Sequence, residues 1–195
     1  ITGSGPNSTG TTQYEIASNN TDAIYHGGIV IPLAAGVIGK TDQAVAPLGV
    51  LNGVEYVDSN TGKTVFSNYW PGSNNVSVDT NHPVKAFVFD DPMQLYVVAA
   101  DGTNTDRATA QADVFSNCDM ASVNNGSTST GQSSDMLDIS SAATTNTLDV
   151  RIVGLYEDDA NVDYSAVGHQ YIVRLNGHFN SGTTIAVGTY ATTGI

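Results

Sequence analysis

Carboxylates are the side chains of this sequence whose type and spacing could do chemistry. They cluster at Asp90-Asp91 and at Glu157-Asp158-Asp159. A glycoside hydrolase needs two carboxyl groups roughly 5 to 9 Å apart across a sugar cleft, so a hydrolase using these acidic loops is one hypothesis. Asp90-Asp91 stands directly before Pro92, however, and turn propensity explains that pair without catalysis.

Oxygen ligands for calcium could come from two segments. Glu157-Asp158-Asp159 has Asn161 and Asp163 nearby, and a second, weaker group is Asp101, Asn104 and Asp106. Neither segment has the full spacing of a calcium-binding loop, and such an acidic cluster is more often a solvated loop. The histidines, His26, His82, His169 and His178, are scattered without standard ligand spacing. We therefore expect no metal site and no cofactor.

Enzyme signatures are absent from the sequence. It contains no G-x-S-x-G, no G-x-x-x-x-G-K-[ST], no G-x-G-x-x-G after a strand and no H-E-x-x-H. Cys118 is the single cysteine, so the chain can form no internal disulfide. A nucleophilic role for Cys118 would need a neighbouring histidine, and the alternative is a buried, inert thiol. We expect a protein that is not an enzyme.

Charge limits the partners of the chain. Nineteen acidic and six basic residues give a net charge of −13 and a pI near 4.2, which repels phosphate backbones and anionic lipids. No apolar run reaches the roughly 18 to 20 residues of a membrane span. We expect neither nucleic acid nor membrane as a partner. Few charged residues with many Ser, Thr, Asn and Gly are typical of β-rich extracellular or virion proteins, or of an ordinary acidic globular protein.

Three β-hairpins are predicted. Residues 54–57 and 64–67 alternate around the turn-forming loop 58–63. Residues 84–90 and 93–100 flank a sharp turn at Asp90-Asp91-Pro92, and residues 148–155 and 168–175 flank an acidic connection. Shorter strands are predicted near residues 14–16, 29–33, 36–40, 136–139 and 185–190. A helix is predicted over residues 105–119, capped by Thr105 or Asp106, with Ala108, Ala112 and Phe115 on one face.

These elements predict a mainly β fold, a small antiparallel β-barrel or sandwich with one short helix and long polar loops. Residues 1–13 are predicted to be a flexible arm, residues 14–179 a single β-rich domain with a polar insertion at about 120–135, and residues 180–195 a tail. No repeat of 20 to 50 residues stands out, which excludes solenoids and propellers.

Tyr69-Trp70-Pro71 contains the only tryptophan of the chain. A Trp-Pro pair at the end of a strand can plug the core of a barrel. The alternative is an exposed anchor, because Trp and Tyr are enriched in interface hot spots.

The region around these aromatic residues resembles a family. L-G-V-L-N-G-V-E-Y-V-D-S-N-T-G-K-T-V-F-S-N-Y-W-P-G at residues 48–72, V-K-A-F-V-F-D-D-P at 84–92 and M-Q-L-Y-V-V at 93–98 are similar to small virion proteins of marine tailed bacteriophages. Their pattern is L-G-V-F-x-G, Y-x-D, F-x-x-Y-W-P and A-x-V-x-D-D-P. Residues 14–18 and 151–155 also resemble that group, so the likeness extends from about residue 14 to about residue 179.

The resemblance implies a protein that decorates or cements the outside of the phage head, on the outer surface of the virion. Its partners would be the major capsid protein and copies of itself. A cement protein needs no catalytic residue. Its many copies together resist the separation of the capsid subunits when packaged DNA presses outward. We expect capsid contacts from the arm and from the aromatic segment, at Ile1, Pro6, Tyr14, Tyr69, Trp70 and Pro71.

Two other classes of function remain open. The first is a receptor- or glycan-binding module of a phage fibre or cell surface, for which sugar binding would quench Trp70 fluorescence. The second is the hydrolase, which would lose activity on Asp90→Asn or Asp158→Asn.

Overall fold

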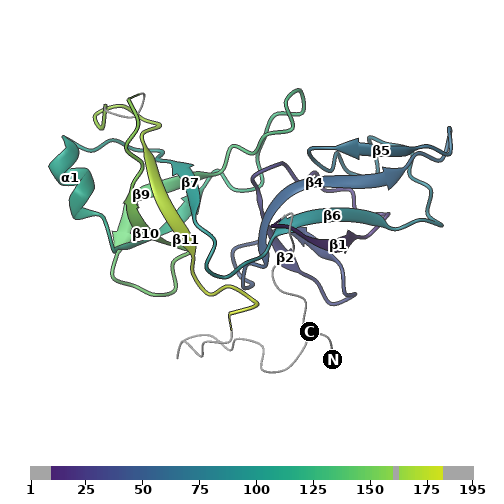
Figure 1. Ribbon diagram of the computed structural model, residues 1–195, viewed down its shortest axis with the longest axis horizontal. Coiled ribbons are helices and arrows are strands. Elements are labelled where there is room, and N and C mark those ends of the chain that lie inside the picture. The colour runs from purple at the N-terminus through teal and green to yellow at the C-terminus, as the bar shows by residue number, and fades with distance from the viewer. Residues whose placement is uncertain (1–9, 160–162, 182–195) are drawn as a thin grey trace. The chain divides into compact units, whose positions relative to one another are not determined.

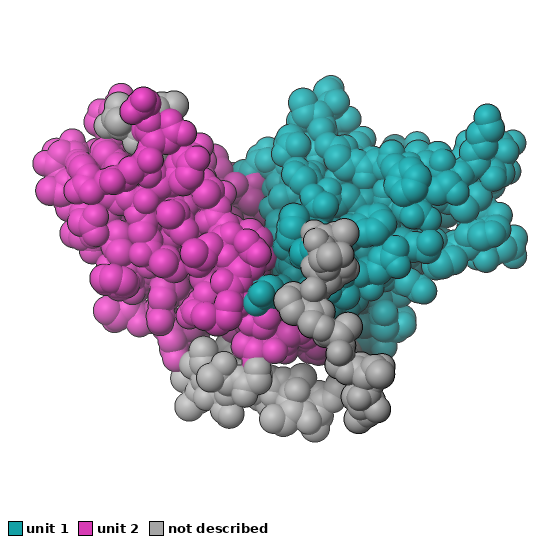
Figure 2. All heavy atoms as spheres, in the orientation of Figure 1, with its two compact units in different colours: residues 1–91, 124–134, 193–195 teal, residues 92–123, 135–192 magenta. Residues whose placement is uncertain are grey.

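The computed structural model describes residues 10–159 and 163–181. Contacts between Cα atoms divide the chain into two compact units (Figure 2). Unit 1 comprises Ile1–Asp91, Asn124–Ser134 and Thr193–Ile195, and unit 2 comprises Pro92–Val123 and Asp135–Thr192. Each unit is built around a sheet of its own. The single domain predicted over residues 14–179 spans both units and stays a prediction.

The sheet of unit 1 closes into a small barrel. Its order is β2-β3-β1-β6-β4-β5, and β2 also pairs with β4, so that five strands form a ring with β5 outside it (Figure 1). We call this ring barrel 1. The strands of the sheet are β1 (Thr12–Ile16), β2 (Ile29–Pro32), β3 (Ile38–Lys40), β4 (Gly49–Val57), β5 (Thr64–Ser67) and β6 (Val84–Phe89).

Strict alternation along β6 shows why this sheet has one buried face. Val84, Ala86 and Val88 are fully buried, because successive side chains of a strand point to opposite faces. Lys85 points outward and forms an ion pair with Glu55 on the neighbouring β4, with Nζ 3.0 Å from Oε1. The sequence pattern V-K-A-F-V-F gives β6 its buried face, and the pairings place it in the middle of the sheet, between β1 and β4.

The sheet of unit 2 also closes. Its order is β7-β11-β10-β8-β9, and a bridge from Ala100 to Leu137 joins the end of β7 to β9, with Asp101 N donating to Leu137 O at 2.9 Å. We call this ring barrel 2. Its elements are β7 (Tyr96–Ala99), α1 (Arg107–Ala112), β8 (Asn117–Ala121), β9 (Met136–Ala143), β10 (Val150–Leu155) and β11 (Gln170–Leu175).

Barrel 1 and barrel 2 have the same connectivity. With the strands of each ring numbered along the chain, the first lies between the fifth and the third, and the second between the third and the fourth. The first and third strands meet in parallel in both rings, at Ile16↔Ile38 and at Ala100↔Leu137. Every other neighbouring pair within the rings is antiparallel.

Backbone irregularities also correspond between the two barrels. The fourth strand of each ring has a bulge at the same place, at Leu51/Gly53 in barrel 1 and at Ile152/Gly154 in barrel 2. Just before the second strand, Gly27 (φ 83°) and Phe115 (φ 75°) both adopt the left-handed conformation and donate to Leu51 O and Ile152 O respectively. Bulges are specific features of a fold rather than defects. The two barrels are therefore structural copies of one another.

The predicted fold class is confirmed, and so are two of the predicted hairpins. The described residues form a mainly β protein with one short helix, in which β4 pairs with β5 and β10 pairs with β11. Strands predicted near residues 14–16, 29–33, 36–40 and 136–139 are present as β1, β2, β3 and β9. The first sheet is mixed rather than purely antiparallel, because β1 and β3 run parallel. The strand predicted at residues 185–190 lies outside the described residues.

The hairpin predicted across Asp90-Asp91-Pro92 is wrong. β6 and β7 belong to different sheets, and the chain passes from unit 1 to unit 2 between Asp91 and Pro92. Both edges of β6 are already paired, with β1 and with β4, so it has no edge left for the next strand.

The predicted helix is shorter than expected. Asp106 caps it, as predicted, by accepting the N–H of Thr109 at 2.8 Å, but α1 ends at Ala112 with Asp113 as its C-cap, and Phe115 beyond it adopts the left-handed conformation. The predicted apolar face is wrong, since Ala110 is the buried residue of the helix and Phe115 is 78% exposed. The end of the predicted helix, from residue 117, belongs to β8.

Cys118 lies on β8 inside barrel 2 and is fully buried. Burial, together with the negative charge of Asp113, raises the pKa of its thiol to about 12 from 9.0. At pH 8 the thiolate fraction of the folded protein is therefore on the order of a thousandfold below that of a free thiol, and the thiolate is the reactive form. We expect alkylation by iodoacetamide to be slower by at least that factor in buffer than in denaturant. Equal rates would contradict the buried position.

Candidate functional site

Trp70 lies in the core of unit 1. Its side chain has no exposed surface, its ring stands edge-on to Tyr56 at 5.8 Å, and its Nε1 donates to Asn20 O at 3.2 Å. Its backbone pairs with Ile24 through two hydrogen bonds of 2.9 Å. For Trp70, the burial agrees with the core-plug interpretation of Tyr69-Trp70-Pro71 and not with the exposed anchor. Trp70 positions its neighbours and presents no surface to a partner.

Tyr69 and Pro71 remain half-buried beside Trp70. The ring of Tyr69 stacks on Tyr25, with centroids 5.5 Å apart and planes within 6° of each other. Its hydroxyl donates to Thr128 O at 3.2 Å. Tyr69 and Pro71 are thus held in fixed positions near the surface, where part of each side chain can be reached.

The segment 124–134 lies against this aromatic pair. Asn68 Nδ2 donates to Thr130 O at 2.7 Å, and His26 N donates to Gly131 O at 2.9 Å. Gly131 has a φ of 72°, a conformation that favours glycine, and a Cβ atom there would lie 2.6 Å from the ring of Tyr69. The sequence suggested only a polar insertion here. Its glycines are the signal that could have indicated a close packing contact.

Tyr14 lies on β1, separated from β5 and the segment after it by β6 and β4 in the sheet. Its hydroxyl donates to Asp90 Oδ2 at 2.7 Å, while Thr12 Oγ1 donates to Asp90 Oδ1 at 2.8 Å. Asp90 therefore ties β1 to the end of β6 as a structural acceptor. Tyr14 is not gathered into one cluster with Tyr69 and Pro71. Ile1 and Pro6 lie outside the described residues.

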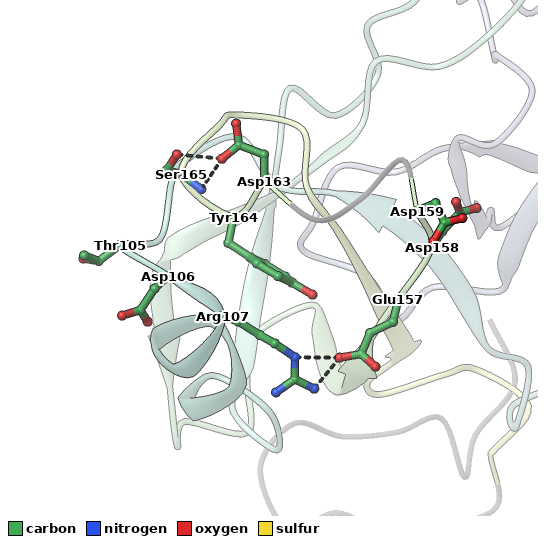
Figure 3. A pocket seen from close by; sticks show the side chains of 9 residues that line it. All are labelled: Thr105, Asp106, Arg107, Glu157, Asp158, Asp159, Asp163, Tyr164 and Ser165. Carbon is green, nitrogen blue, oxygen red and sulfur yellow. Dashed lines mark hydrogen bonds and ion pairs between the residues drawn. The ribbon is translucent and has the colours of Figure 1, made fainter.

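The acidic connection of barrel 2 borders an open pocket of about 560 Å³ (Figure 3). Arg107 and Glu157 point toward one another, whereas Asp158 and Asp159 point away from Arg107. Arg107 Nε donates to Glu157 Oε1 at 2.8 Å and Nη2 donates to the same oxygen, an ion pair that raises the pKa of Arg107. The lining consists of Thr105, Asp106, Arg107, Glu157, Asp158, Asp159, Asp163, Tyr164 and Ser165.

Two carboxylates of the pocket are engaged in local turns. Asp163 accepts hydrogen bonds from the Ser165 hydroxyl at 2.6 Å and from the Ser165 N–H at 3.0 Å. These bonds lower the pKa of Asp163, and the N–H of Thr109 does the same for the pKa of Asp106. Both groups thus stay ionised at neutral pH and serve the backbone, as turn and cap residues do.

Acid is expected to weaken the fold through such carboxylates. Hydrogen bonds hold the pKa of Asp163 below its usual 3.8, so the unfolded chain binds this proton more readily than the folded one. The stabilisation is present above the usual pKa and is lost as pH falls through the lowered pKa. Thermal unfolding between about pH 5 and pH 2.5 should show a shallower loss of Tm for Asp163→Asn than for wild type. Identical slopes would contradict this role.

No cluster of three His, Cys, Asp or Glu side chains that could hold a metal occurs in residues 10–159 and 163–181. Asn161 lies outside these ranges. In the second predicted oxygen group the side chains serve separate contacts: Asp101 accepts from Ile139 N at 3.3 Å, Asn104 donates to Asp113 at 2.8 Å and Asp106 caps α1. The absence of a metal or cofactor stays a prediction. Within the described part of the chain, no helix is long and apolar enough to cross a membrane.

An apolar surface on barrel 2 was missed in the sequence. Val97 on β7 and Ile172 on β11 are directly opposite, and Val153 stands at the adjacent bulge of β10. Val97 is 51% and Val153 38% exposed, and the preceding Met93 and Leu95 are exposed too. Residues 93–100 form a nearly continuous apolar run in the sequence, in which no alternation shows that one side faces solvent.

We call this surface the outer face. It is formed by the outward side chains of β7, β10 and β11, which include no Asp or Glu: Val97, Ala99, Arg151, Val153, Gln170, Ile172 and Arg174.

Comparison with protein-family models, curated proteins and solved structures finds no match for this chain.

Proposed function

We propose that this chain is a structural virion protein that decorates the outside of a tailed-phage head and bridges major capsid subunits. The observation that carries the proposal is the outer face of barrel 2. Exposed apolar side chains that are contiguous across neighbouring strands mark protein interaction sites more often than catalytic ones. The resemblance to phage virion proteins at positions 48–72 and 84–98 gives the class of partner.

Charge and architecture are compatible with that role. A net charge of −13 would hinder contact with packaged DNA but is tolerable on the outer surface of a head. Two structural copies of one barrel in one chain offer two surfaces, and a protein that bridges subunits needs at least two. Modest affinity at each contact suffices when many copies share the load.

Copy counting on purified heads tests the proposal. Quantitative mass spectrometry should find this chain at on the order of hundreds of copies per head. Heads stripped of it by mild denaturant should burst at a lower temperature than intact heads and recover on adding the protein back. A few copies confined to tails would overturn the proposal in favour of a fibre protein.

The pocket beside Arg107 favours a second candidate, a receptor- or glycan-binding module. Its polar lining and the Tyr164 ring are the kinds of group that fix an uncharged polar ligand in a concave site. Trp70 is fully buried, so a ligand cannot quench its fluorescence by direct contact. Calorimetry would instead measure ligand binding in the pocket beside Arg107. Saturable heat with a soluble glycan, abolished by Arg107→Ala, would support this candidate.

A further inference from the structure

Two arginines face each other on the outer face of barrel 2. Arg151 on β10 and Arg174 on β11 are directly opposite in the ladder, and like charges in that position destabilise a sheet. Neither forms an ion pair with any residue in 10–159 or 163–181, where the four ion pairs use Lys40, His82, Lys85 and Arg107. Arg151 Nε donates to Asn117 Oδ1 at 3.2 Å, and Arg174 Nη1 lies 3.7 Å from Met93 Sδ.

Barrel 1 shows that the fold does not need this charge pair. The position just before the bulge of the fourth strand is held by Val50, and its partner on the fifth strand is Phe89. Val50 stands before Leu51 as Arg151 stands before Ile152. An apolar cross-strand pair therefore fills the same place in the other copy of the barrel. The two arginines call for a role other than stability.

Their neighbours on the outer face indicate what they bind. The chain has only six basic residues against nineteen acidic ones, yet two of the six stand here, on strands β10 and β11, which like β7 contain no Asp or Glu. Guanidinium groups pair bidentately with carboxylates, and arginine beside apolar side chains is characteristic of interface centres. The complementary surface carries carboxylates flanked by apolar side chains.

We propose that Arg151 and Arg174, together with Val97, Val153 and Ile172, form a docking face for a partner protein that presents carboxylates beside apolar side chains. Resting on the proposed function, that partner is the major capsid subunit. The net charge of −13 disfavours nucleic acid, and the apolar side chains on the face add nothing to phosphate binding. A second copy of the chain would bring carboxylates but also its own charge of −13.

The binding test uses heads stripped of this protein and the fluorescently labelled full chain. Arg151→Glu/Arg174→Glu and Arg151→Val/Arg174→Phe should each bind at least about tenfold more weakly than wild type. The control Lys40→Gln/Lys63→Gln also removes two positive charges and should bind as wild type does. If wild type does not bind heads, the proposed function fails. If wild type and both arginine variants bind equally well, the docking face alone is overturned.

A stability test excludes a purely structural role. Arg151→Val/Arg174→Phe installs the pair found in barrel 1, and Asn117 Oδ1 keeps its bond from Asn176 Nδ2 at 3.0 Å. The Tm of this variant should equal or exceed that of wild type while head binding falls. A lower Tm would overturn the proposal, because the arginines would then stabilise the fold. Wild-type self-association in sedimentation velocity that the variant loses would assign the face to a second copy and overturn the capsid assignment.

Discussion

Trp70→Ala is expected to lower the free energy of unfolding by about 3 to 5 kcal/mol, the range for removing a large aromatic side chain from a core. The indole has no exposed surface, packs edge-on to Tyr56 and donates to Asn20 O. Its removal leaves a cavity, while Asn20 O keeps the hydrogen bond from Ser73 N at 2.8 Å. Urea unfolding followed by far-UV circular dichroism measures the change, since no tryptophan fluorescence remains.

Phe66→Ala on β5 provides the matched control. Phe66 is also aromatic and lies in the same unit of the chain, but it is 72% exposed. Its replacement should change the free energy of unfolding by no more than about 0.5 kcal/mol, as is usual for surface positions. Similar losses for the two variants would contradict the assignment of Trp70 to the core. A selective loss at Trp70 would leave Tyr69 and Pro71 as the accessible part of the aromatic segment.

Gly72→Ala is expected to cost about 3 kcal/mol or more, through two effects at one position. Gly72 has a φ of 87°, where a side chain is strained, and a Cβ there would lie 2.3 Å from the backbone oxygen of Thr21. A backbone atom cannot swing aside as the end of a flexible side chain can. The segment that follows Trp70 would therefore have to move, and the loss would appear in the same urea unfolding experiment.

Gly62→Ala separates the two effects. Gly62 also has a positive φ, 67°, but no atom lies within 4 Å of the position that a Cβ would take there. Only the left-handed conformation is then penalised, at about 1 to 2 kcal/mol. If Gly72→Ala costs no more than Gly62→Ala, the close approach to Thr21 is not tight.

Local sequence patterns predicted where the strands of this protein lie. Which strands pair with one another was predictable only for strands joined by a short connection. Residues 54–57 and 64–67 pair as expected because a six-residue loop leaves them little choice. Residues 84–90 and 93–100 are just as close in sequence but do not pair, since β1 arrives from the start of the chain to fill the free edge of β6. Alternation identifies a strand and its buried side, and says nothing about a distant partner.

The candidate site was predictable in part for the same reason. Tyr69-Trp70-Pro71 stood out by residue type, and the core-plug alternative for Trp70 is confirmed by its burial. The arginine pair did not stand out, because Arg151 and Arg174 become neighbours only through the ladder of β10 and β11. The duplication was equally hidden, since two barrels can share pairings and bulges while their side chains differ, as Val50 and Arg151 do.

Segment 124–134 has a consequence for how the chain is made. It contacts Tyr69 and His26 in unit 1, yet it is translated only after residues 92–123 of unit 2. Ribosomes add about 5 to 20 residues per second, so the 43 residues from Pro92 to Ser134 separate the synthesis of Asp91 from that of Ser134 by roughly 2 to 9 seconds. During that interval the stacked tyrosines of the nascent chain are uncovered. Neither unit corresponds to one continuous stretch of message, and a truncation between residues 92 and 123 would leave the first barrel without this segment.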